Sequence, residues 1–500
     1  MMARVINYLA IDMGAESGRA IVGRFDGKRL ELEEVHRFAN CSVRLPDGLH
    51  WDTLRMWIEI KQGIGLAARK VEGQLASLGI DTWGVDFGLL DRDGALIFNP
   101  YHYRDSRTEG MLEAAFQRVP RQQIFEYTGI QFLELNSLYQ LLSMAINRSP
   151  ALEVAQTFLL TPDLFNYWLT GRKVSEFSIA TTSQCFDPRC NDWARPMLEQ
   201  LGIPTHIFPE VIEPGSVLGP LAPWVTDDLD VKDLQVVAPA CHDTGSAVVG
   251  VPARGPGFGW ISSGTWSIAG AELTEPIIND QSLAYNFTNE GGMNHTFRFC
   301  RNIMGLWLVQ ECRRTWARQG EELSYAQLTA MAAEAKPLRS LVDPDCHEFL
   351  RPGDMPSRIR AYCQRTGQPV PETKGEIVRC ALDGIALKYR WVMERCEEML
   401  GHRLEPIHIV GGGTQNQLLS QLAADALQRQ VVTGPVEATA TGNIIAQAMA
   451  MGHLASLEEG RQVVRDSFSL HSFEPSGQAG WDDAYARLLK LMEMDACQKD

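Results

Sequence analysis

The sequence has no long apolar run and no block of basic residues. None of its 500 residues lies in a stretch that approaches the ~20 apolar residues of a membrane span. Lysine and arginine together number 46 against 62 aspartates and glutamates, so the formal net charge is −16. We therefore expect neither a membrane nor a nucleic acid as partner. Because the net charge is negative, any phosphate site must be built locally from backbone amides, a metal ion or a few side chains.

Cysteine pairs of the CxxC type are missing as well. The 11 cysteines stand singly between Cys41 and Cys497. This spacing is typical of reduced, mostly buried thiols rather than of a disulfide framework or a zinc site. The first stretch, MMARVINYLAIDMG, has a short apolar segment and an early aspartate, unlike a signal peptide. We therefore expect a cytoplasmic protein.

The common nucleotide-binding signatures are also absent. Neither GxxxxGK(S/T) nor GxGxxG occurs, which argues against a Walker-type NTPase and against a dinucleotide-binding Rossmann domain. What is present is an ordinary globular composition, with 45% hydrophobic and 22% charged residues. Since single cores stop growing at roughly 250–300 residues, a chain of this length predicts two large domains.

Both halves of the chain begin with the same pattern. Residues 5–39 alternate apolar strands with short turns that contain glycine, which predicts an antiparallel meander, and a helical pattern follows at 51–71. The stretch GFGWISSGTWSIAGAEL at 257–273 again indicates strand, turn and strand, and a long amphipathic helix is predicted at 376–400. This repetition favours a duplicated architecture with a cleft between two related domains.

Three turns of small residues stand directly after strands: DMGAESGR at 12–19, SSGTWS at 262–267 and VGGGTQN at 410–416. Backbone N–H groups in such turns can bind phosphate oxygens without net positive charge. Taken singly, each turn is more often only a turn. Asp12 follows an apolar strand, where a buried carboxylate needs a partner, and a hydrated Mg²⁺ beside phosphates would supply one.

A further candidate lies near the middle of the chain, in VVAPACHDTGSAVVG. Asp243 stands between a histidine and a threonine, in the link between the two halves. A carboxylate within hydrogen-bond reach of a substrate hydroxyl can act as the general base of phosphoryl transfer. The alternative is that Asp243 only caps a helix, and that His242 is an ordinary packed histidine.

The chain resembles the FGGY carbohydrate kinase family over almost its whole length. The matching segments follow the family order from near residue 8 to near residue 450; they include AIDMGAESGR, GIDTWGVDFGLLD, CHDTGSAV, SSGTWS, TNEGG, RNIMGLWLVQ, HIVGGGTQNQLL and GPVEATATGNI. The resemblance implies an α/β fold of two actin-like, ribonuclease H-like domains with a cleft between them. It implies a sugar-binding domain at 1–245, a nucleotide-binding domain at 246–455 and a helical tail at 456–500.

The resemblance also implies the reaction, which is the transfer of a phosphoryl group from ATP, with Mg²⁺, to the 1-hydroxyl of a ketose. L-rhamnulose is the expected substrate; L-fuculose, L-xylulose, or a catalytically silent sensor of nucleotide and sugar are the alternatives. The expected partners are the small-molecule ketose and ATP, and the oligomeric state stays open.

Site residues are carried over from the family position by position. Asp243 matches the catalytic base and Asp12 the metal site. The matches to substrate contacts are Gly84, His242, Asp243, Thr244 and Asn302. The matches to nucleotide contacts are Ala15, Glu16, Ser17, Gly18, Arg19, Thr265, Gln310 and Gly412.

Two residues depart from what we expect of the family. Glu16 places a carboxylate in the first phosphate turn, where it would repel a γ-phosphate, so we predict that it points outward or helps to order Mg²⁺. Cys241 precedes the His-Asp pair where serine is also common, and a small buried thiol is tolerable there. Trp83, Asp86, Asp105 and Arg107 are candidates for the sugar pocket, although Trp83 can be a core aromatic and the last two can form a local ion pair.

Overall fold

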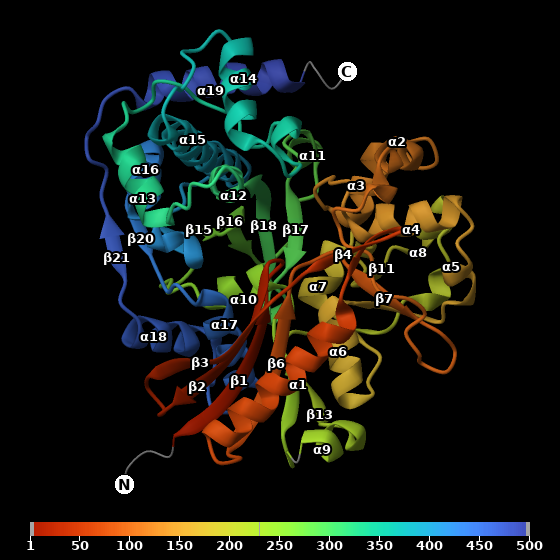
Figure 1. The fold of residues 1–500 in the computed structure, drawn as a ribbon. Helices are drawn as coiled ribbons and strands as arrows, with labels where there is room; N and C mark the ends of the chain where they lie inside the picture. The colour runs from red at the N-terminus through yellow and green to blue at the C-terminus, as the bar shows by residue number, and fades with distance from the viewer. Residues whose placement is uncertain (1–4, 230, 497–500) are drawn as a thin grey trace. The chain divides into compact units, whose positions relative to one another are not determined.

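The computed structural model describes residues 5–229 and 231–496, and they form two compact units (Figure 1). Unit 1 contains the chain up to Arg254, residues Glu272–Phe299 and residues Ala438–Phe468. Unit 2 contains Gly255–Ala271, Cys300–Glu437 and the chain from Ser469 onwards. Each unit therefore combines segments that are far apart in the sequence.

Unit 1 is built on a six-stranded sheet with the order β13-β14-β6-β1-β2-β3. Its strands are β1 (Ile6–Met13), β2 (Ser17–Phe25), β3 (Leu30–Ala39), β6 (Leu75–Thr82), β13 (Ser216–Pro220) and β14 (Gln235–Ala238). The first three pair antiparallel, which confirms the predicted meander, whereas β6 runs parallel to both β1 and β14. β1 is almost fully buried, as expected for a central strand.

The predicted helix at 51–71 is present as α1 (Thr53–Lys70). It starts where it does because the side chain of Asp52 accepts a hydrogen bond from the Arg55 N–H at 3.2 Å. Met56, Ile60 and Ile64 lie on its buried face, at the spacing of an amphipathic helix.

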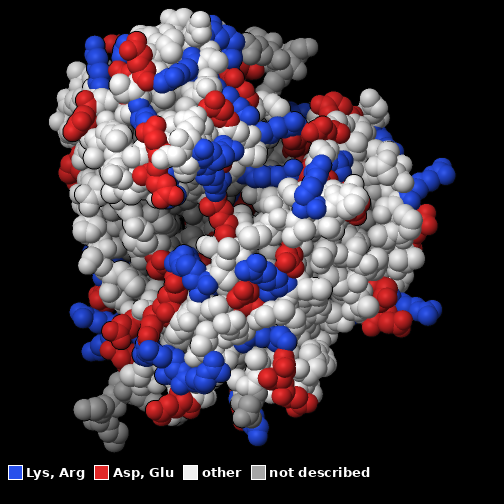
Figure 2. All heavy atoms as spheres, in the orientation of Figure 1, with Lys and Arg blue, Asp and Glu red and all other residues white. Residues whose placement is uncertain are grey.

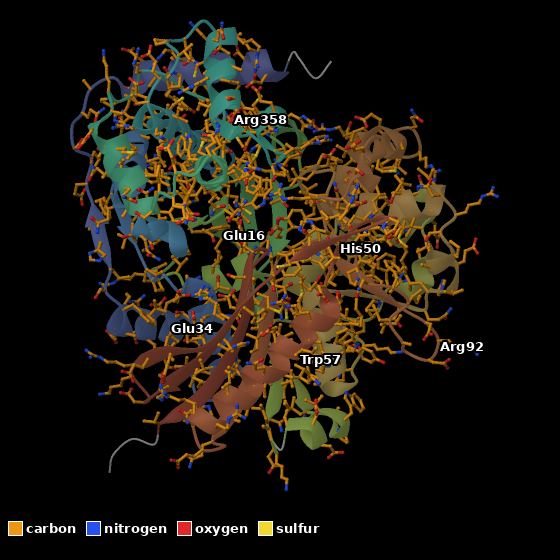
Figure 3. All side chains as sticks on the ribbon, viewed as in Figure 1. Glu16, Glu34, His50, Trp57, Arg92 and Arg358 are labelled. Carbon is orange, nitrogen blue, oxygen red and sulfur yellow. The ribbon has the colours of Figure 1, made fainter. Side chains whose placement is uncertain are left out.

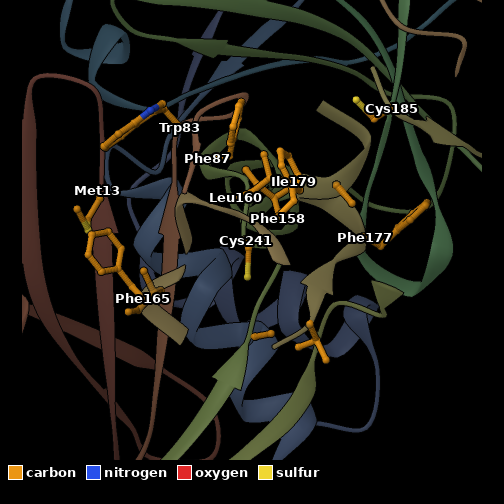
Figure 4. Packing of buried hydrophobic residues seen from close by; sticks show 14 of the residues in the cluster. Met13, Trp83, Phe87, Phe158, Leu160, Phe165, Phe177, Ile179, Cys185 and Cys241 are labelled. Carbon is orange, nitrogen blue, oxygen red and sulfur yellow. The ribbon is translucent and has the colours of Figure 1, made fainter. Parts of the chain in front are cut away.

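The long connection between β6 and β13 builds a second part of unit 1. Its elements are β7 (Phe87–Leu90), α2 (Met111–Phe116), α3 (Arg121–Thr128), α4 (Ser137–Ile146), α5 (Pro150–Val154), β8 (Thr157–Leu160), α6 (Thr161–Thr170), β9 (Ser175–Glu176), α7 (Phe177–Thr182), β10 (Phe186–Asp187), β11 (Asp192–Trp193), α8 (Arg195–Leu201) and β12 (Val211–Ile212). Its side chains share one apolar cluster with α1 and the sheet; members include Met13, Trp83, Phe87, Phe158, Leu160, Phe165, Phe177 and Ile179 (Figure 4).

Two helices that lie far apart in the sequence pack together in unit 1. They are α10 (Asp243–Val249) and α17 (Ala438–Ala450), and α17 also contacts β1 and β6. The approach is so close that a Cβ atom on Gly442 would lie 1.8 Å from the backbone oxygen of Ser246. Only glycine fits at this position, which explains why the stretch ATATGN carries one inside a helix.

The second sheet has seven strands in the order β17-β18-β16-β15-β19-β20-β21. They are β15 (Gly259–Ser263), β16 (Trp266–Leu273), β17 (Thr288–Gly291), β18 (Phe297–Met304), β19 (Ile407–Val410), β20 (Val431–Thr433) and β21 (His471–Phe473). β15 and β16 form an antiparallel hairpin, as predicted, and β15, β19 and β20 run parallel. The second half of the chain thus restarts with a hairpin, as its sequence indicates.

The helices of unit 2 are α12 (Trp307–Arg318), α13 (Tyr325–Glu334), α14 (Met355–Arg365), α15 (Lys374–Leu400), α16 (Gln417–Leu427) and α19 (Trp481–Ala496). The predicted helix at 376–400 is present as α15 and begins two residues earlier. Thr373 and Glu376 form a capping box there, in which each side chain accepts from the other residue's N–H.

The segment from residue 456 onwards, expected to be helical, contains α18 (Leu457–Ser467), strand β21 and α19. β21 pairs antiparallel with β20 and so extends the second sheet. The predicted domain boundaries, at residues 245 and 455, stay predictions.

Acidic and basic side chains are interspersed on the face drawn in Figure 2. Across the described parts of the chain, no helix combines the length and the apolar character that crossing a bilayer requires.

Candidate active site

Two aspartates and an arginine line up across the sheet of unit 1. Asp12 on β1 is the register partner of Arg19 on β2 and of Asp81 on β6. Because register partners point to the same face of a sheet, the three side chains lie in one row. Asp12 is 4% exposed, and Arg19 donates from Nη2 to its carboxylate. Its strand-end position and its burial are as predicted, and the structure gives it a cationic partner in Arg19.

The turn between β1 and β2 is held from one side by Asn40. The backbone N–H of Asn40 donates to the Glu16 oxygen at 3.1 Å, and its side-chain amide donates to the Gly14 oxygen at 2.5 Å. In a planar trans peptide the N–H points opposite to the carbonyl, so the N–H groups of Ala15 and Ser17 are directed away from Asn40. Such an array of N–H groups suits a phosphate.

The remaining predicted members of this turn differ in exposure. Glu16 is exposed at the tip of the hairpin (Figure 3), in agreement with the predicted outward orientation. Gly18 is buried in β2, opposite Met13, and its α-carbon lies against the ring of Phe38. The turn therefore keeps its carboxylate at the solvent side and its glycine at the core side.

Asp243 begins helix α10 at the end of a strand-like segment. Beyond β14 the chain continues beside β6. There the Thr82 N–H donates to the Cys241 oxygen at 2.9 Å, and Thr82 forms an isolated parallel β-bridge with His242. The N-cap of α10 is His242 and not Asp243, so the capping interpretation of Asp243 is wrong. The carboxylate instead accepts, at Oδ1, hydrogen bonds from the N–H of Thr244 at 2.5 Å and from its hydroxyl at 3.2 Å.

His242 and Thr244 therefore flank the carboxylate as the sequence predicted. The His242 Nε2 atom lies 3.3 Å from Asp243 Oδ1, and the Asp243 side chain is 30% exposed. All three of these contacts are made to Oδ1. Among the described residues, Oδ2 is thus the oxygen that is left to accept a proton from a substrate.

Burial and neighbouring negative charge raise the pKa values of two carboxyl groups of unit 1, Asp81 and Asp243. Burial raises the pKa of Asp81 well above its usual range, and the negative charges of Asp12 and Asp243 raise it further. Burial also raises the pKa of Asp243; His242 opposes this shift and Asp12 adds to it. A cluster of like charges that lack a full set of cations is typical of a functional site.

Gly84 lies next to this cluster, in the loop after β6. A Cβ atom here would be 3.0 Å from the hydroxyl of Thr182, which accepts a hydrogen bond from the Val85 N–H at 3.2 Å. The loop is therefore held closely against α7, on the same strand end as Asp81. Gly84, His242, Asp243 and Thr244 are brought together in unit 1.

Of the four candidates for the sugar pocket, Asp86 has the most contacts. It is 1% exposed, and it accepts hydrogen bonds from the indoles of Trp51 at 2.6 Å and Trp83 at 2.9 Å and from the Gln140 amide at 3.1 Å. Burial raises its pKa to about 6, although these donors oppose the shift. Asp86 therefore fixes the indole rings of Trp51 and Trp83.

The predicted ion pair between Asp105 and Arg107 takes a different form. Asp105 accepts from the backbone N–H of Arg107 at 3.0 Å and of Leu49 at 2.7 Å. The Arg107 guanidinium donates to Gln140 Oε1 at 2.6 Å and lies 3.9 Å from the ring centre of Tyr101. The carboxylate therefore serves the backbone, and the cation is directed towards Gln140 and, through it, towards Asp86.

In unit 2 the predicted nucleotide contacts lie around the turn between β15 and β16. Gln310 on α12 donates from Nε2 to the Thr265 hydroxyl at 3.1 Å, and the Trp307 N–H donates to the Thr265 oxygen at 3.0 Å. Gly412 is exposed on the short 3₁₀ helix η5 (Gly412–Gln415). The next residue, Gly413, approaches Ser263 so closely that a Cβ atom would lie 2.1 Å from its hydroxyl. Thr265, Gln310 and the glycine turn are thus grouped in this unit.

Asn302 lies on β18 in unit 2, and the end of its strand is fixed by a buried charge cluster. Asp345 accepts from the Met304 N–H at 3.0 Å and pairs with Lys388 Nζ at 3.1 Å. Lys388 is 1% exposed and also pairs with Asp343 at 2.8 Å. The backbone on which Asn302 stands is therefore anchored by ionic contacts to α15.

Several buried polar side chains of unit 1 near the predicted site residues were not singled out from the sequence. Asp81 stands inside the recognised motif GIDTWGVDF, but only the parallel pairing of β6 with β1 places it beside Asp12. Asn443 on α17 donates to Asp81 Oδ2 at 2.6 Å. Glu176 is buried, has a pKa that burial raises to about 7, and accepts the Cys241 N–H at 3.0 Å. Glu290 is the fourth of these residues. Its place in the recognised segment TNEGG was the only feature of the sequence that pointed to it.

Family models and curated relatives identify the family of the chain. The model of the FGGY family of carbohydrate kinases matches the chain with its N-terminal domain at residues 7–250 and with its C-terminal domain at residues 259–451. A rhamnulokinase of Bacteroides thetaiotaomicron is 42% identical over 479 residues, which cover 96% of this chain and 98% of that one. A rhamnulokinase of Oceanobacillus iheyensis is 41% identical over 465 residues, which cover 93% and 97%.

Solved structures of other kinases have the same fold as this chain. A gluconate kinase of Lactobacillus acidophilus superposes with a TM-score of 0.79 at 16% identity, covering 99% of this chain and 97% of that one. A glycerol kinase of Plasmodium falciparum, solved with ADP, has a TM-score of 0.77 at 14% identity and covers 99% and 98%. The predicted two-domain α/β fold of the actin-like type is confirmed. The chain belongs to the FGGY family of carbohydrate kinases.

Proposed function

We propose that this protein is an ATP-dependent kinase that phosphorylates the 1-hydroxyl of L-rhamnulose, giving L-rhamnulose 1-phosphate and ADP. The observation that carries the proposal is the identity of 36–42% over nearly the whole chain to several proteins named rhamnulokinase. The half-buried carboxylate of Asp243 supports the same reaction, because it has the exposure and the free oxygen that a general base needs.

In the proposed reaction, the oxygen of the sugar 1-hydroxyl attacks the γ-phosphorus of ATP, and Asp243 Oδ2 accepts the proton of this hydroxyl. The bond from phosphorus to the bridging oxygen breaks, and ADP leaves. His242 and Thr244 hold Oδ1 by the contacts described above, so the carboxylate keeps one orientation. Positioning of this kind supplies much of the rate in phosphoryl transfer, since little covalent chemistry is required of the protein.

Phosphate binding is assigned to the turns. The N–H groups of Ala15 and Ser17 face away from Asn40, and Arg19 places a guanidinium at the same strand end. Gly18, Glu16, Thr265, Gln310 and Gly412 complete the nucleotide contacts that we propose, and Gly84 and Asn302 the sugar contacts. These assignments are consistent with the exposed turn in each unit.

A divalent metal, expected to be Mg²⁺, fits the carboxylates of unit 1. Asp81 Oδ1 is buried without a hydrogen-bond partner in the structure, and Asp12 and Asp243 raise the pKa of its carboxyl group. Among residues 5–229 and 231–496, no three acidic, histidine or cysteine side chains form a closed metal cage. Mg²⁺ commonly keeps several waters and takes one or two carboxylates. Asp12, together with its register partner Asp81 on the neighbouring strand, would therefore hold the ion. When bound, the ion neutralises charge on the phosphates.

The proposal extends to location and domain roles. ATP is a cytoplasmic substrate, and the ten cysteines that the structure describes are free thiols, mostly buried; we therefore place the protein in the cytoplasm. We assign sugar binding to residues 1–245 and nucleotide binding mainly to residues 246–455.

A coupled assay of ADP release tests the function. ATP with Mg²⁺ is offered with L-rhamnulose, L-fuculose, L-xylulose, L-ribulose or D-xylulose, and kcat/KM is compared. We expect a preference of about tenfold or more for L-rhamnulose, which corresponds to one well-placed polar contact. Faster turnover of another ketose would keep the reaction and replace the substrate. Sugar binding without ADP release would identify a silent sensor.

The role of Asp243 is tested by Asp243→Asn in the same assay. The amide has the size of the carboxylate but cannot accept the proton, so we expect kcat to fall by at least about 10²–10⁴-fold, the range of general-base catalysis. The affinity for ATP, measured by calorimetry, should change little. A variant that retains most of its turnover would remove Asp243 from the role of base.

A further inference from the structure

A buried arginine and a buried glutamate lie behind the histidine that flanks the proposed base. Arg298 on β18 is 0% exposed and Glu290 on β17 is 4% exposed. The Arg298 Nη1 atom lies 3.0 Å from His242 Nδ1 and 3.1 Å from Glu290 Oε2. These residues belong to unit 1, together with His242 and Asp243. The chain of contacts runs from Glu290 through Arg298 and His242 to Asp243.

The guanidinium is held in place on its other edges. Its Nε atom donates to the Gly291 oxygen at 2.8 Å, and Nη2 lies 3.5 Å from the Ser178 oxygen. The same turn of α7 holds His242, because the Ser178 hydroxyl accepts from the His242 N–H at 3.2 Å. The ring of His242 and the guanidinium therefore share one rigid support.

The contact between Arg298 and His242 decides which ring nitrogen carries the proton. Arginine has donors and no acceptor, and it stays protonated in proteins. In a hydrogen bond with Arg298, His242 Nδ1 must therefore present its lone pair. The proton of the neutral ring then sits on Nε2, which faces Asp243 Oδ1 at 3.3 Å.

We infer that Glu290 and Arg298 are positioning residues that fix His242 in the tautomer donating from Nε2 to the proposed base, Asp243. Without Arg298, Nδ1 is open to a proton, because Glu290 Oε2 lies 3.3 Å away and accepts one. The ring would then turn a lone pair towards Asp243, or become a cation between two carboxylates. Either state disturbs the oxygen that orients the base.

Glu290 is needed because the arginine is fully buried. A buried guanidinium left without a counter-ion is strongly destabilising, and a partnered carboxylate offsets part of that cost. Burial alone would raise the pKa of Glu290, but the charge of Arg298 is the main cause that lowers it, and the pKa is about 2. Glu290 is therefore an anion at neutral pH, and Arg298 keeps its position beside the ring.

This inference rests on the proposed function, but its first test does not. The protein contains 11 histidines, and two-bond ¹⁵N–¹H correlation spectra of the histidine-labelled full chain separate protonated from unprotonated ring nitrogens. The His242→Gln variant identifies the signal. We expect Nε2 to be protonated and Nδ1 unprotonated in the wild type. Protonation at Nδ1 in the wild type would overturn the inference, whether or not the protein phosphorylates L-rhamnulose.

Variants then connect the tautomer to turnover. In Arg298→Met we expect protonation at Nδ1 and a kcat lower by about 10–100-fold, the usual effect of losing a residue that orients a functional histidine. Arg298→Lys keeps a donor without an acceptor and should restore part of both readouts. Glu290→Gln preserves the size of the side chain. It should change the protonation of His242 and kcat in the same direction as Arg298→Met, but by less. It also provides the test if Arg298→Met does not fold.

Arg461→Met is the matched control. Arg461 is a buried arginine of the same unit that pairs with Glu272 at 2.9 Å. Its loss should lower the melting temperature without changing the His242 spectrum. If Arg461→Met and Arg298→Met alter turnover alike while the ring signals stay as in the wild type, Arg298 has only a structural role and the inference is refuted.

Discussion

The close approach of α10 and α17 makes a quantitative prediction for Gly442→Ala. The new Cβ atom would lie 1.8 Å from the Ser246 oxygen, whereas such contacts are essentially never shorter than 3.0 Å. Both helix backbones are involved, so the helices must separate by about 1.2 Å. Overpacking of this kind costs up to ~3 kcal/mol, and the better helix propensity of alanine returns ~1 kcal/mol. We therefore expect a net loss of about 2 kcal/mol.

The loss should be visible in stability and in turnover. At roughly 2 °C for each kcal/mol in a large domain, the melting temperature of unit 1 should fall by about 4 °C. Since Asp243 begins the helix that is displaced, kcat should also fall, by about 10²-fold for a shift near 1 Å. Scanning calorimetry and the ADP-release assay measure the two effects.

Gly65→Ala in α1 is the control for this prediction. Gly65 is buried in a helix like Gly442, but a Cβ atom there would meet its first neighbour at 3.6 Å. With room for the methyl group, only the propensity gain remains, and we expect a stabilisation of about 1 kcal/mol. Gly442→Ala with wild-type melting temperature and kcat would refute the reasoning from close approach.

Three further changes have defined outcomes. In Asp86→Asn the new NH₂ group faces at least one of the indole and amide N–H groups that now donate to the carboxylate. The free energy of unfolding, measured by chemical denaturation, should fall by about 2–3 kcal/mol, against ~1 kcal/mol for the control Trp83→Phe. The pKa of Glu290 is lowered from 4.5 to about 2, so its contribution to stability is present above pH 4.5 and is lost as the pH falls through 2. The difference in unfolding free energy between wild type and Glu290→Gln should therefore narrow by about 1 kcal/mol between pH 6 and pH 4, and a constant difference would contradict the assignment. Asp12→Asn should raise the Mg²⁺ concentration needed for half-maximal turnover by about tenfold or more, as expected when a ligand of a hydrated ion is lost, whereas an unchanged requirement would remove Asp12 from the metal site.

Local sequence signals were sufficient for several elements, whereas the roles of the site residues stay predictions. Alternating apolar residues and glycine turns predicted the first meander and the β15–β16 hairpin, because both are built from neighbours in sequence. Asp243 was found from its position between a histidine and a threonine after an apolar run. Its helix-cap alternative failed because the cap depends on backbone geometry at His242, which composition does not reveal.

Contacts between distant segments could not be predicted in the same way. Asn443 meets Asp81 across 362 positions, and Arg298 meets His242 across 56. No periodicity links such pairs, since they are created by parallel strand pairing and by helix packing. For the same reason the sequence offered only the neighbouring Asp105 as an ionic partner of Arg107, whereas the guanidinium donates to Gln140, which approaches from α4.

The composition of unit 1 has a consequence for biosynthesis. The strands that carry Asp12 and Asp81 leave the ribosome early, but α17, which supplies Asn443, belongs to residues 438–468. At 5–20 residues per second, the ~180 residues between position 254 and that segment take roughly 10–40 s to synthesise. For this time β6 lacks the helix that covers it, and the amide partner of a buried carboxylate does not yet exist. The nascent chain therefore holds an unfinished domain while its other domain is being made, and this is the period in which a chaperone has most to protect.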